Sequence, residues 1–150
     1  MSTPPRHADA RVARIVQLFE GLTRADLVRL VRFYAPDATF KDPFNAVQGV
    51  EAVRRVFGHM FDTLDEPRFV VHDIVVQGDQ CFLSWDFEFG LRRRAARRMR
   101  IHGASHLRLG ADGRIACHRD YWDAAEELYE KLPLLGALMR WLRRRLQTPP

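Results

Sequence analysis

Apolar residues recur at helical spacing through the first half of the chain. Between residues 8 and 22 they fall on one face of a 3.6-residue period, which predicts an amphipathic helix. The members of this face are Ala8, Val12, Ile15, Val16, Phe19 and Leu22. A similar stripe runs from Val50 to Leu64 and predicts another amphipathic helix over residues 48–64.

A shorter helix is predicted between these two. Thr23 and Asp26 have the spacing of a capping box, with Asp in the position that Glu usually takes, so the helix is expected to begin there. Its apolar positions are Leu27, Leu30, Val31 and Tyr34. Pro36 is expected to end it, because the residue before a proline disfavours the helical conformation.

From residue 69 the period of the pattern changes to two, which is typical of strands with one buried face. Turn signals at Gly78–Asp79 and Gly110–Gly113 separate consecutive strands and favour an antiparallel meander. A short additional strand is predicted at residues 38–40, before the helix over 48–64. The four strands of the meander are predicted at residues 69–77, 81–89, 99–109 and 114–122.

The end of the chain, residues 124–146, is predicted to be helical with a break at Pro133. Its apolar stripe consists of Leu134, Leu135, Leu138, Trp141 and Leu142, and arginines occupy the other side. A basic amphipathic helix of this kind packs on its own domain or on a second subunit, or lies on an anionic membrane surface. The sequence leaves these alternatives open, and the first two are the commoner.

Helices segregated against one face of an antiparallel sheet define an α+β domain. We expect residues 8–123 to form a curved sheet shaped like a cone, with the N-terminal helices packed across it in a cystatin-like α+β roll. Residues 1–7 are expected to be disordered, and residues 124–146 to form a helical tail.

Composition narrows the class of protein. The chain has 150 residues, 47% of them hydrophobic, which suits one globular domain with a core of its own. It has no apolar run near the roughly 20 residues of a membrane span, and its first ten residues lack the apolar centre of a secretory signal. Cys81 and Cys117 provide neither a disulfide framework nor a metal-ligand spacing, so a cytoplasmic protein is expected.

The net charge of +5 raises the question of nucleic acid. The arginines cluster in residues 91–100 and 140–146, without interleaved stacking aromatics or a nucleic-acid motif. We therefore interpret the two clusters as a solvated hairpin tip and a basic helix face, and expect no nucleic-acid partner.

Three residues could carry acid–base chemistry. Asp42 precedes Pro43 and is either a turn former or a carboxylate placed for catalysis; the sequence alone leaves both open. His118 and Asp120 project from the same side of the last strand, as does Trp122. A His and an Asp two residues apart can exchange a proton, or can form a structural hydrogen bond that steadies the sheet.

Two segments carry a family resemblance. "YAPDATFKDP" and "GASHLRLGADGRIACHRDYWD", together with the order of elements over residues 10–123, resemble the nuclear transport factor 2-like superfamily, and its SnoaL-like and ketosteroid isomerase-like branch most closely. That superfamily contains isomerases, cyclases, dehydratases, epoxide hydrolases and members that only bind ligands. The resemblance therefore implies a fold more firmly than it implies a reaction.

The resemblance also implies roles for single residues. Asp42 falls on the general base of the ketosteroid isomerases, and the face of the last strand with His118 and Asp120 falls on their cavity wall. Phe19 and Ser105 stand where those enzymes have the two donors of the oxyanion hole, a tyrosine and a protonated aspartic acid. Because a phenyl ring donates no hydrogen bond and loss of one donor costs on the order of a hundredfold in rate, steroid isomerisation itself is not expected.

The expectation is therefore an apolar cavity for a small hydrophobic ligand, with an isomerase, cyclase or dehydratase reaction in which Asp42 is the base and His118 and Asp120 assist. The alternative is a ligand-binding or dimerisation module without catalysis. The predicted ligand-binding residues are Phe19, Phe57, Trp85, Phe87, Ser105 and Trp122. No cofactor is expected, and no metal, because His102, His106 and His118 lack a ligand spacing. A homodimer that pairs through the outer face of the sheet is expected from the resemblance.

Overall fold

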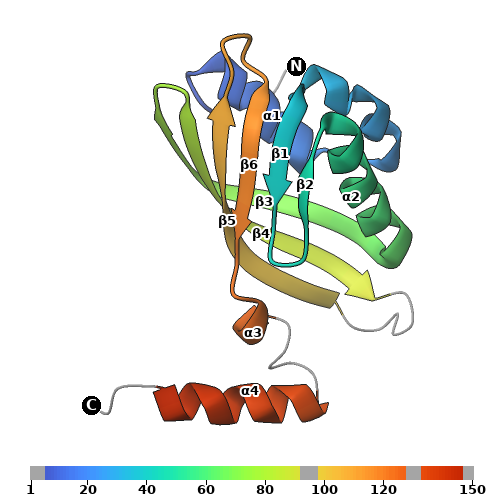
Figure 1. Cartoon of the computed structure of the whole chain (residues 1–150), viewed down its shortest axis with the longest axis vertical. Helices are drawn as coiled ribbons and strands as arrows, with labels where there is room; N and C mark the ends of the chain where they lie inside the picture. The colour runs from blue at the N-terminus through green and yellow to red at the C-terminus, as the bar shows by residue number, and fades with distance from the viewer. Residues whose placement is uncertain (1–5, 92–97, 128–132, 147–150) are drawn as a thin grey trace.

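The first predicted helix forms, but it covers fewer residues than its apolar pattern does. In the computed structural model, which describes residues 6–91, 98–127 and 133–146, helix α1 spans Ala10–Glu20 (Figure 1). The Asp9 side chain caps it by accepting the backbone N–H of Arg11. Its apolar face is buried against the sheet, where each aliphatic side chain contributes about 1.5–3 kcal/mol.

The second predicted helix is shorter and tighter than expected. It is a 3-10 helix, η1 (Arg24–Arg32), and it begins at the predicted capping box, where Asp26 accepts hydrogen bonds from the backbone N–H and hydroxyl of Thr23. Tyr34 was predicted to lie on this helix, and that prediction is wrong; the helix ends at Arg32, short of the end that Pro36 predicted. The helix ends before Tyr34 because Ala35, which precedes Pro36, takes an extended conformation.

Tyr34 and Pro36 belong instead to strand β1 (Tyr34–Lys41), which is longer than the predicted strand at residues 38–40. Its register against the neighbouring strand shifts between Tyr34 and Thr39, around the proline that lacks a backbone donor. A short strand that the sequence did not predict, β2 (Ala46–Gln48), then pairs antiparallel with β1. Asp42 thus lies in the connection of a β1–β2 hairpin.

The remaining elements follow the predicted order. Helix α2 spans Val50–Thr63 and buries Val53 and Phe57. The strands of the meander are β3 (Leu64–Gln77), β4 (Gln80–Leu91), β5 (Arg98–Leu109) and β6 (Ile115–Tyr121). The turns at Gly78–Asp79 and Gly110–Gly113 lie where they were predicted. The arginine-rich stretch predicted as a hairpin tip lies, for residues 92–97, outside the described residues.

All six strands form one curved sheet in the order β2-β1-β6-β5-β4-β3. Neighbouring strands are antiparallel except β1 and β6, which run parallel because the crossover through α2 and the meander returns the chain to the edge of β1. The predicted α+β fold with a curved sheet is thus confirmed, and it differs from the prediction in having one parallel pair of strands. Helices α1, η1 and α2 close one face of this sheet, and the core lies between them.

The described part of the tail contains two helices, α3 (Ala124–Glu127) and α4 (Pro133–Leu146), which lie beyond the ends of the strands in Figure 1. The apolar stripe of α4 is exposed, with Leu134 at 89% and Trp141 at 47%. At the other end, Arg6 forms an ion pair with Glu20, while residues 1–5 of the segment predicted to be disordered are outside the description. Among the described helices, none has the length and apolar character of a membrane span.

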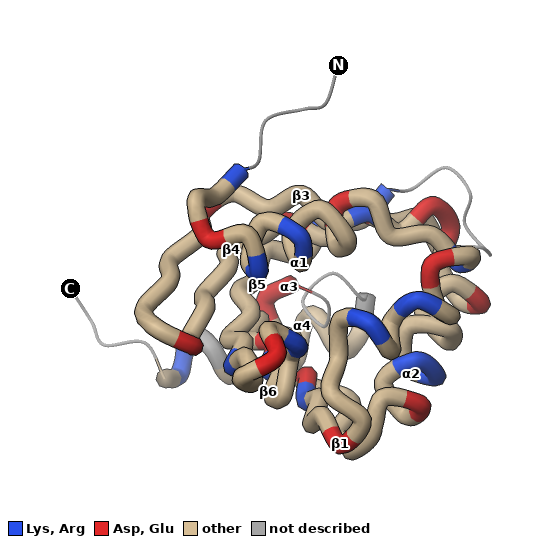
Figure 2. The backbone as a smooth tube through the Cα atoms, turned by 90° about the horizontal axis from the view of Figure 1, so that it is seen from above, with Lys and Arg blue, Asp and Glu red and all other residues tan. Residues whose placement is uncertain are grey.

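Charges of both signs are interspersed along α2 and its surroundings (Figure 2). Within α2, Glu51 pairs with Arg54 at 2.7 Å, and Asp62 pairs with Arg24 of η1. Exposed pairs of this kind contribute at most about 1 kcal/mol each. They therefore contribute little to the stability of the fold compared with the burial of the core.

Candidate active site

Strand β6 carries two polar side chains into the interior of the domain. His118 and Asp120 alternate with Arg119, so both point to the face that the helices cover, as the strand period predicts. His118 is 5% exposed, although it is a polar residue in an apolar core. A buried imidazole needs hydrogen-bond partners on both nitrogens, and the structure provides them.

Tyr34 and Asp120 are these partners. The Tyr34 hydroxyl lies 2.7 Å from Nδ1 of His118, and Nε2 of His118 lies 2.7 Å from Oδ1 of Asp120. Tyr34 comes from β1, which pairs with β6, so the two strands hold the three side chains in a line. The sequence predicted the His118–Asp120 pair but missed Tyr34.

A second branch reaches the same carboxylate oxygen. The indole N–H of Trp85 donates to the hydroxyl oxygen of Ser105 at 2.8 Å, and that hydroxyl donates to Oδ1 of Asp120 at 2.5 Å. Ser105 lies opposite Asp120 in the β5–β6 ladder. Among the described residues, both hydrogen bonds to Asp120 end on Oδ1, and Oδ2 receives none.

The direction of the proton donors follows from the chemistry of Tyr34. Burial, and then the negative charge of Asp120, raise the pKa of Tyr34 well above its ordinary value, so its hydroxyl keeps its proton. We therefore assign the hydroxyl as donor to Nδ1 of His118, which leaves the proton of the ring on Nε2, directed at Asp120. Two chains of donors thus converge on one carboxylate, Tyr34 through His118 and Trp85 through Ser105.

Aromatic rings hold the imidazole in place. Phe40 meets the His118 ring edge to face with centroids 4.8 Å apart, and the Phe19 ring lies 5.6 Å away. Phe19, which stands where the resemblance places a tyrosine donor, thus packs on the imidazole. Such ring pairs prefer these offset and edge-on geometries, so the position of His118 is fixed by packing as well as by hydrogen bonds.

An apolar pocket of about 370 Å³ opens beside Asp120. This volume lies within the range of roughly 300–1,000 Å³ that is usual for small-molecule sites. The Asp120 carboxylate is one of the few ionisable groups of the wall, with Asp42 and His59. Four of the predicted ligand-binding residues line this pocket: Phe57, Trp85, Phe87 and Trp122.

The other two predicted ligand-binding residues, Phe19 and Ser105, line a smaller cavity deeper in the domain. It measures about 20 Å³ and is also lined by His118 and Asp120. A cavity of this size holds one water molecule at most. Asp120 lines both cavities, so it lies between the polar chain and the larger pocket.

Asp42 forms a turn and also borders the larger pocket. Its Oδ1 accepts the backbone N–H groups of Phe44 and Asn45 at 2.7 and 2.6 Å, as a turn former does. The side-chain amide of Asn45 donates to both carboxylate oxygens. Asp42 also lines the 370 Å³ pocket, on which Phe44 and Trp122 meet edge to face at 5.5 Å.

The other histidines are distributed as the strand period predicts. His102 and His106 lie on the outer face of β5, away from Ser105 and from His118. The three histidines that we considered as a metal set are thus divided between two faces.

Nothing in the spacing of the sequence indicated Tyr34, because its partner strand is about 80 residues away in the chain.

A family model described as a SnoaL-like domain matches residues 15–118. This chain belongs to the SnoaL-like family. The match begins within α1 and ends at His118 within β6, so Asp120 and the tail follow it in the chain. A search of the curated proteins finds no match.

Solved structures share the fold of this SnoaL-like protein. An NTF2-like protein of unknown function from Burkholderia pseudomallei is 18% identical with a TM-score of 0.68, over 77% of this chain and 92% of that one. An LEH-like epoxide hydrolase from M. tuberculosis is 15% identical, with a TM-score of 0.67 over 89% and 96%. A putative SnoaL-like polyketide cyclase from Shewanella putrefaciens is 18% identical, with a TM-score of 0.65 over 79% and 95%. Identities this low show a common fold, on which different chemistries are found.

Proposed function

We propose that this SnoaL-like protein catalyses proton transfer on a small, largely apolar molecule, as an isomerase, cyclase or dehydratase does. The observation that carries the proposal is the position of Asp120, which receives two buried donor chains on Oδ1 and lines the apolar pocket. Oδ2 is then the oxygen that exchanges a proton with the ligand. Asp120 thus takes the central role among the three residues predicted from the sequence.

The neighbours of Asp120 suit that role. When its carboxylate is charged, His118 and Ser105 stabilise the negative charge by donating to Oδ1. When Oδ2 gains a proton, the same bonds hold the carboxyl group in one orientation. A positioned carboxylate of this kind contributes about 10²–10⁴-fold to the rate of a proton transfer.

Asp42 is the second carboxylate of the same pocket, and we propose that it divides the work with Asp120. One takes the proton from the ligand and the other returns it at a second atom, which is the net chemistry of an isomerisation. Its hydrogen bonds to Asn45 fix the direction of the Asp42 carboxylate. The names of two structures of the same fold, a polyketide cyclase and an epoxide hydrolase, support a reaction on a small organic molecule.

Deuterium exchange tests this proposal without knowledge of the natural substrate. A bicyclic enone in D2O exchanges the hydrogens on the saturated carbon next to its carbonyl and on the saturated carbon attached to the far end of its double bond, and proton NMR follows the loss of each signal. We expect the protein to accelerate exchange, and Asp120→Asn to slow the catalysed part at least about a hundredfold. Asp42→Asn should remove the exchange at one of the two positions.

The control is Asp37→Asn, which replaces a carboxylate of β1 that is absent from the wall of the pocket. It should exchange the enone as fast as the unmodified chain. Exchange that is equally fast in Asp120→Asn would contradict the role of Asp120. If no protein in the series exceeds buffer with any of several apolar ketones, the acid–base proposal fails.

Two observations favour the alternative of a binding module without catalysis. Both oxygens of Asp42 are engaged in the turn, and Phe19 occupies the place of an oxyanion donor. Such a protein would hold apolar ketones in the pocket, as displacement of a fluorescent dye would report, and would leave their hydrogens unexchanged. If the protein both binds the ketones and accelerates the exchange of their hydrogens, the enzyme is favoured over the binding module.

A further inference from the structure

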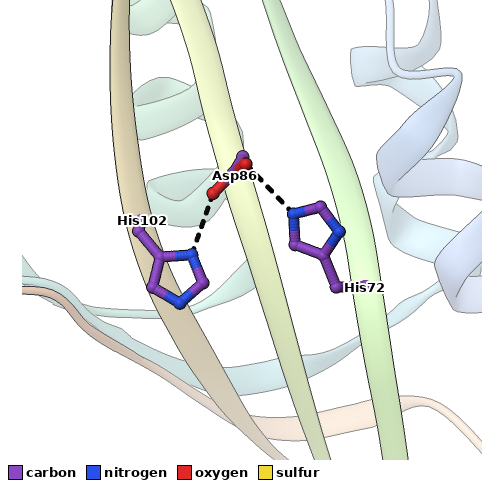
Figure 3. Close-up of side chains that lie close together, drawn as sticks. All are labelled: His72, Asp86 and His102. Carbon is purple, nitrogen blue, oxygen red and sulfur yellow. Dashed lines mark hydrogen bonds and ion pairs between the residues drawn. The ribbon is translucent and has the colours of Figure 1, made fainter.

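The outer face of the sheet carries a second polar cluster, remote from the pocket. His72 of β3, Asp86 of β4 and His102 of β5 lie in a row across three neighbouring strands (Figure 3). Asp86 Oδ2 lies 3.1 Å from Nε2 of His72, and Oδ1 lies 2.8 Å from Nδ1 of His102. Because His102 and Asp86 face each other in the β4–β5 ladder, their contact follows from the register.

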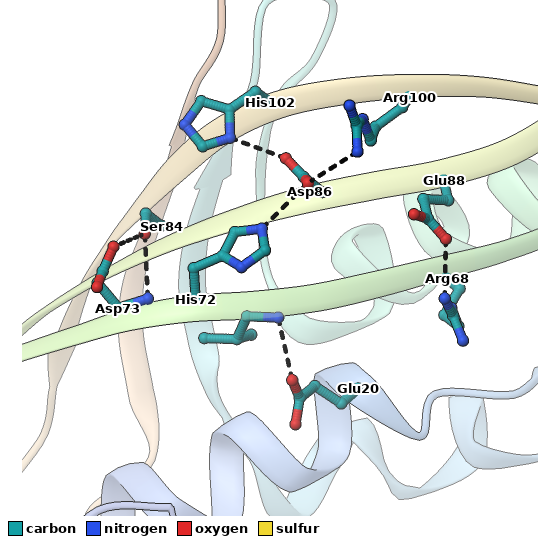
Figure 4. A network of polar contacts seen from close by, with 10 residues as sticks. Glu20, Arg68, His72, Asp73, Ser84, Asp86, Glu88, Arg100 and His102 are labelled. Carbon is teal, nitrogen blue, oxygen red and sulfur yellow. Dashed lines mark hydrogen bonds and ion pairs between the residues drawn. The ribbon is translucent and has the colours of Figure 1, made fainter.

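A β-bulge brings His72 into the row. The β3–β4 register shifts between Val71 and Ile74, so that His72 and Asp73 both reach the outer face. The bulge is held from two sides, as Figure 4 shows. The Val71 N–H donates to Glu20 Oε1 of α1 at 3.0 Å, and Ser84 donates to Asp73 at 2.8 Å. The backbone position of His72 is therefore fixed by the fold.

We propose that His72, Asp86 and His102 bind a divalent transition-metal ion of the zinc class. Two imidazole nitrogens and one carboxylate oxygen form a ligand set that zinc uses, with a water molecule in the fourth position. One such atom from each residue lies within 4.8 Å of the other two. Imidazole ligands favour zinc, copper and nickel over magnesium and calcium, which prefer oxygen. The proposal adds a site that the spacing of the histidines in the sequence did not indicate.

The geometry needs a small adjustment. Ligand atoms at about 2.0–2.2 Å from a tetrahedral zinc ion lie roughly 3.4 Å apart, so the widest separation closes by up to about 1.4 Å. The side chains of His72 and His102 are 43% and 65% exposed, which leaves them room to rotate. Asp86 is 16% exposed and serves as the fixed ligand between them.

One nearby group opposes a bound cation. Nη1 of Arg100 lies 3.8 Å from Oδ2 of Asp86, the oxygen that His72 also contacts (Figure 4). The Arg100 side chain is 68% exposed and makes this contact at the long end of an ion pair, which contributes little. It can turn to solvent when the metal binds. We therefore expect Arg100→Gln to strengthen metal binding.

A metal ion in this position would join β3, β4 and β5 through their side chains. The three strands carry the inner residues Val71, Trp85 and Ile101 of the core, so the ion would stabilise the sheet behind the pocket. It would not touch the proposed ligand site, because Asp86 and Trp85 project to opposite faces of β4. The inference is thus independent of the proposed proton transfer.

Zinc titration of the untagged chain tests the site, with a chromophoric chelator as competitor and the melting temperature as a second readout. We expect one ion per chain and a higher melting temperature when zinc is bound. His72→Gln, Asp86→Asn and His102→Gln should each weaken binding at least about tenfold, since loss of a mere hydrogen bond to a ligand already costs that much.

The matched control is His106→Gln, which alters a histidine on the same face of β5. His106 stacks on Phe82 with ring centroids 4.3 Å apart and lies outside the cluster. This variant should bind zinc as tightly as the unmodified chain. Equal zinc affinity for the unmodified chain and for His72→Gln and His102→Gln, or an equal loss in His106→Gln, would overturn the proposal.

Discussion

At the scale of single residues, the candidate site depends on how five polar side chains are connected inside an apolar core. Asp120 accepts from His118 and Ser105, and each of these is held in turn by a second donor, Tyr34 or Trp85. A buried network of this kind is stabilising when every member is satisfied and costly when one partner is lost. Removal of one outer donor should therefore affect both stability and the orientation of the carboxylate.

Tyr34→Phe is the sharpest test of that connection. The variant keeps the ring and leaves Nδ1 of His118 without its partner in a buried position, which costs about 1–3 kcal/mol in the free energy of unfolding. Urea unfolding measures this cost. An unchanged free energy of unfolding would mean that the hydroxyl does not hold His118.

The same residue should make the protein sensitive to alkali. Because the pKa of Tyr34 is raised in the folded state, its contribution to stability is complete below the unfolded pKa of about 10 and is lost as the pH rises above it. We expect the melting temperature of the unmodified protein to fall more steeply above pH 10 than that of Tyr34→Phe. If the melting temperatures of the two proteins fall equally with pH, ionisation of Tyr34 does not cause the loss of stability in alkali.

Sequence reasoning found part of this network. His118 and Asp120 were predicted to share a face because strand periodicity is local and the two residues are adjacent on one face. Tyr34 was assigned to a helix, because Leu27, Leu30 and Val31 continue at helical spacing up to it. The extended conformation that Ala35 takes before Pro36 was the signal that could have corrected the assignment.

At the scale of elements, β1 and the β4–β5 pair position the site. The sequence predicted the β3–β4–β5–β6 meander, because turn residues join consecutive strands. It did not predict β2 or the parallel pairing of β1 with β6, which depends on contacts between residues about 80 positions apart. Long-range pairing of this kind has no local pattern, so it had to be seen in the structure.

The β4–β5 pair offers an element-scale prediction at Gly103. A Cβ at this position would lie 2.5 Å from Cη2 of Trp85, closer than real contacts allow. Gly103→Ala should therefore displace the indole from Ser105 and lower the free energy of unfolding by about 1–3 kcal/mol. Near-ultraviolet circular dichroism should report the altered environment of the tryptophan.

Gly110→Ala is the comparison for that variant, because a Cβ there would meet no atom closer than 3.4 Å. It should leave both the unfolding free energy and the tryptophan signal close to those of the unmodified protein. A Gly103→Ala protein as stable as Gly110→Ala would show that the indole does not fill the space above β5.

At the scale of the whole molecule, the folded domain and the tail differ in how they are stabilised. The core of α1, η1, α2 and the sheet buries its large apolar residues, whereas α4 exposes the leucines of its stripe and Trp141. The predicted partner of that stripe, a second subunit, its own domain or an anionic membrane, stays a prediction. Because these described residues of the stripe are exposed, we expect the stability of the domain not to depend on α4.

Deletion of residues 133–150 should therefore change the melting temperature by less than about 4 °C, the shift that roughly 1 kcal/mol gives in a domain of this size. Differential scanning calorimetry of the full and shortened chains measures it. A fall of ten degrees or more would mean that the exposed stripe of α4 is covered in solution.

The central claim is that the apolar pocket holds a small molecule against the Oδ2 atom of Asp120. A crystal structure of the protein with a bicyclic enone or a phenol of similar shape tests it most directly. The account predicts a polar or reacting atom of the ligand within about 2.6–3.2 Å of Oδ2, or joined to it through one water molecule. A ligand bound elsewhere, or one seated in the pocket with Asp120 turned away from it, would contradict the account.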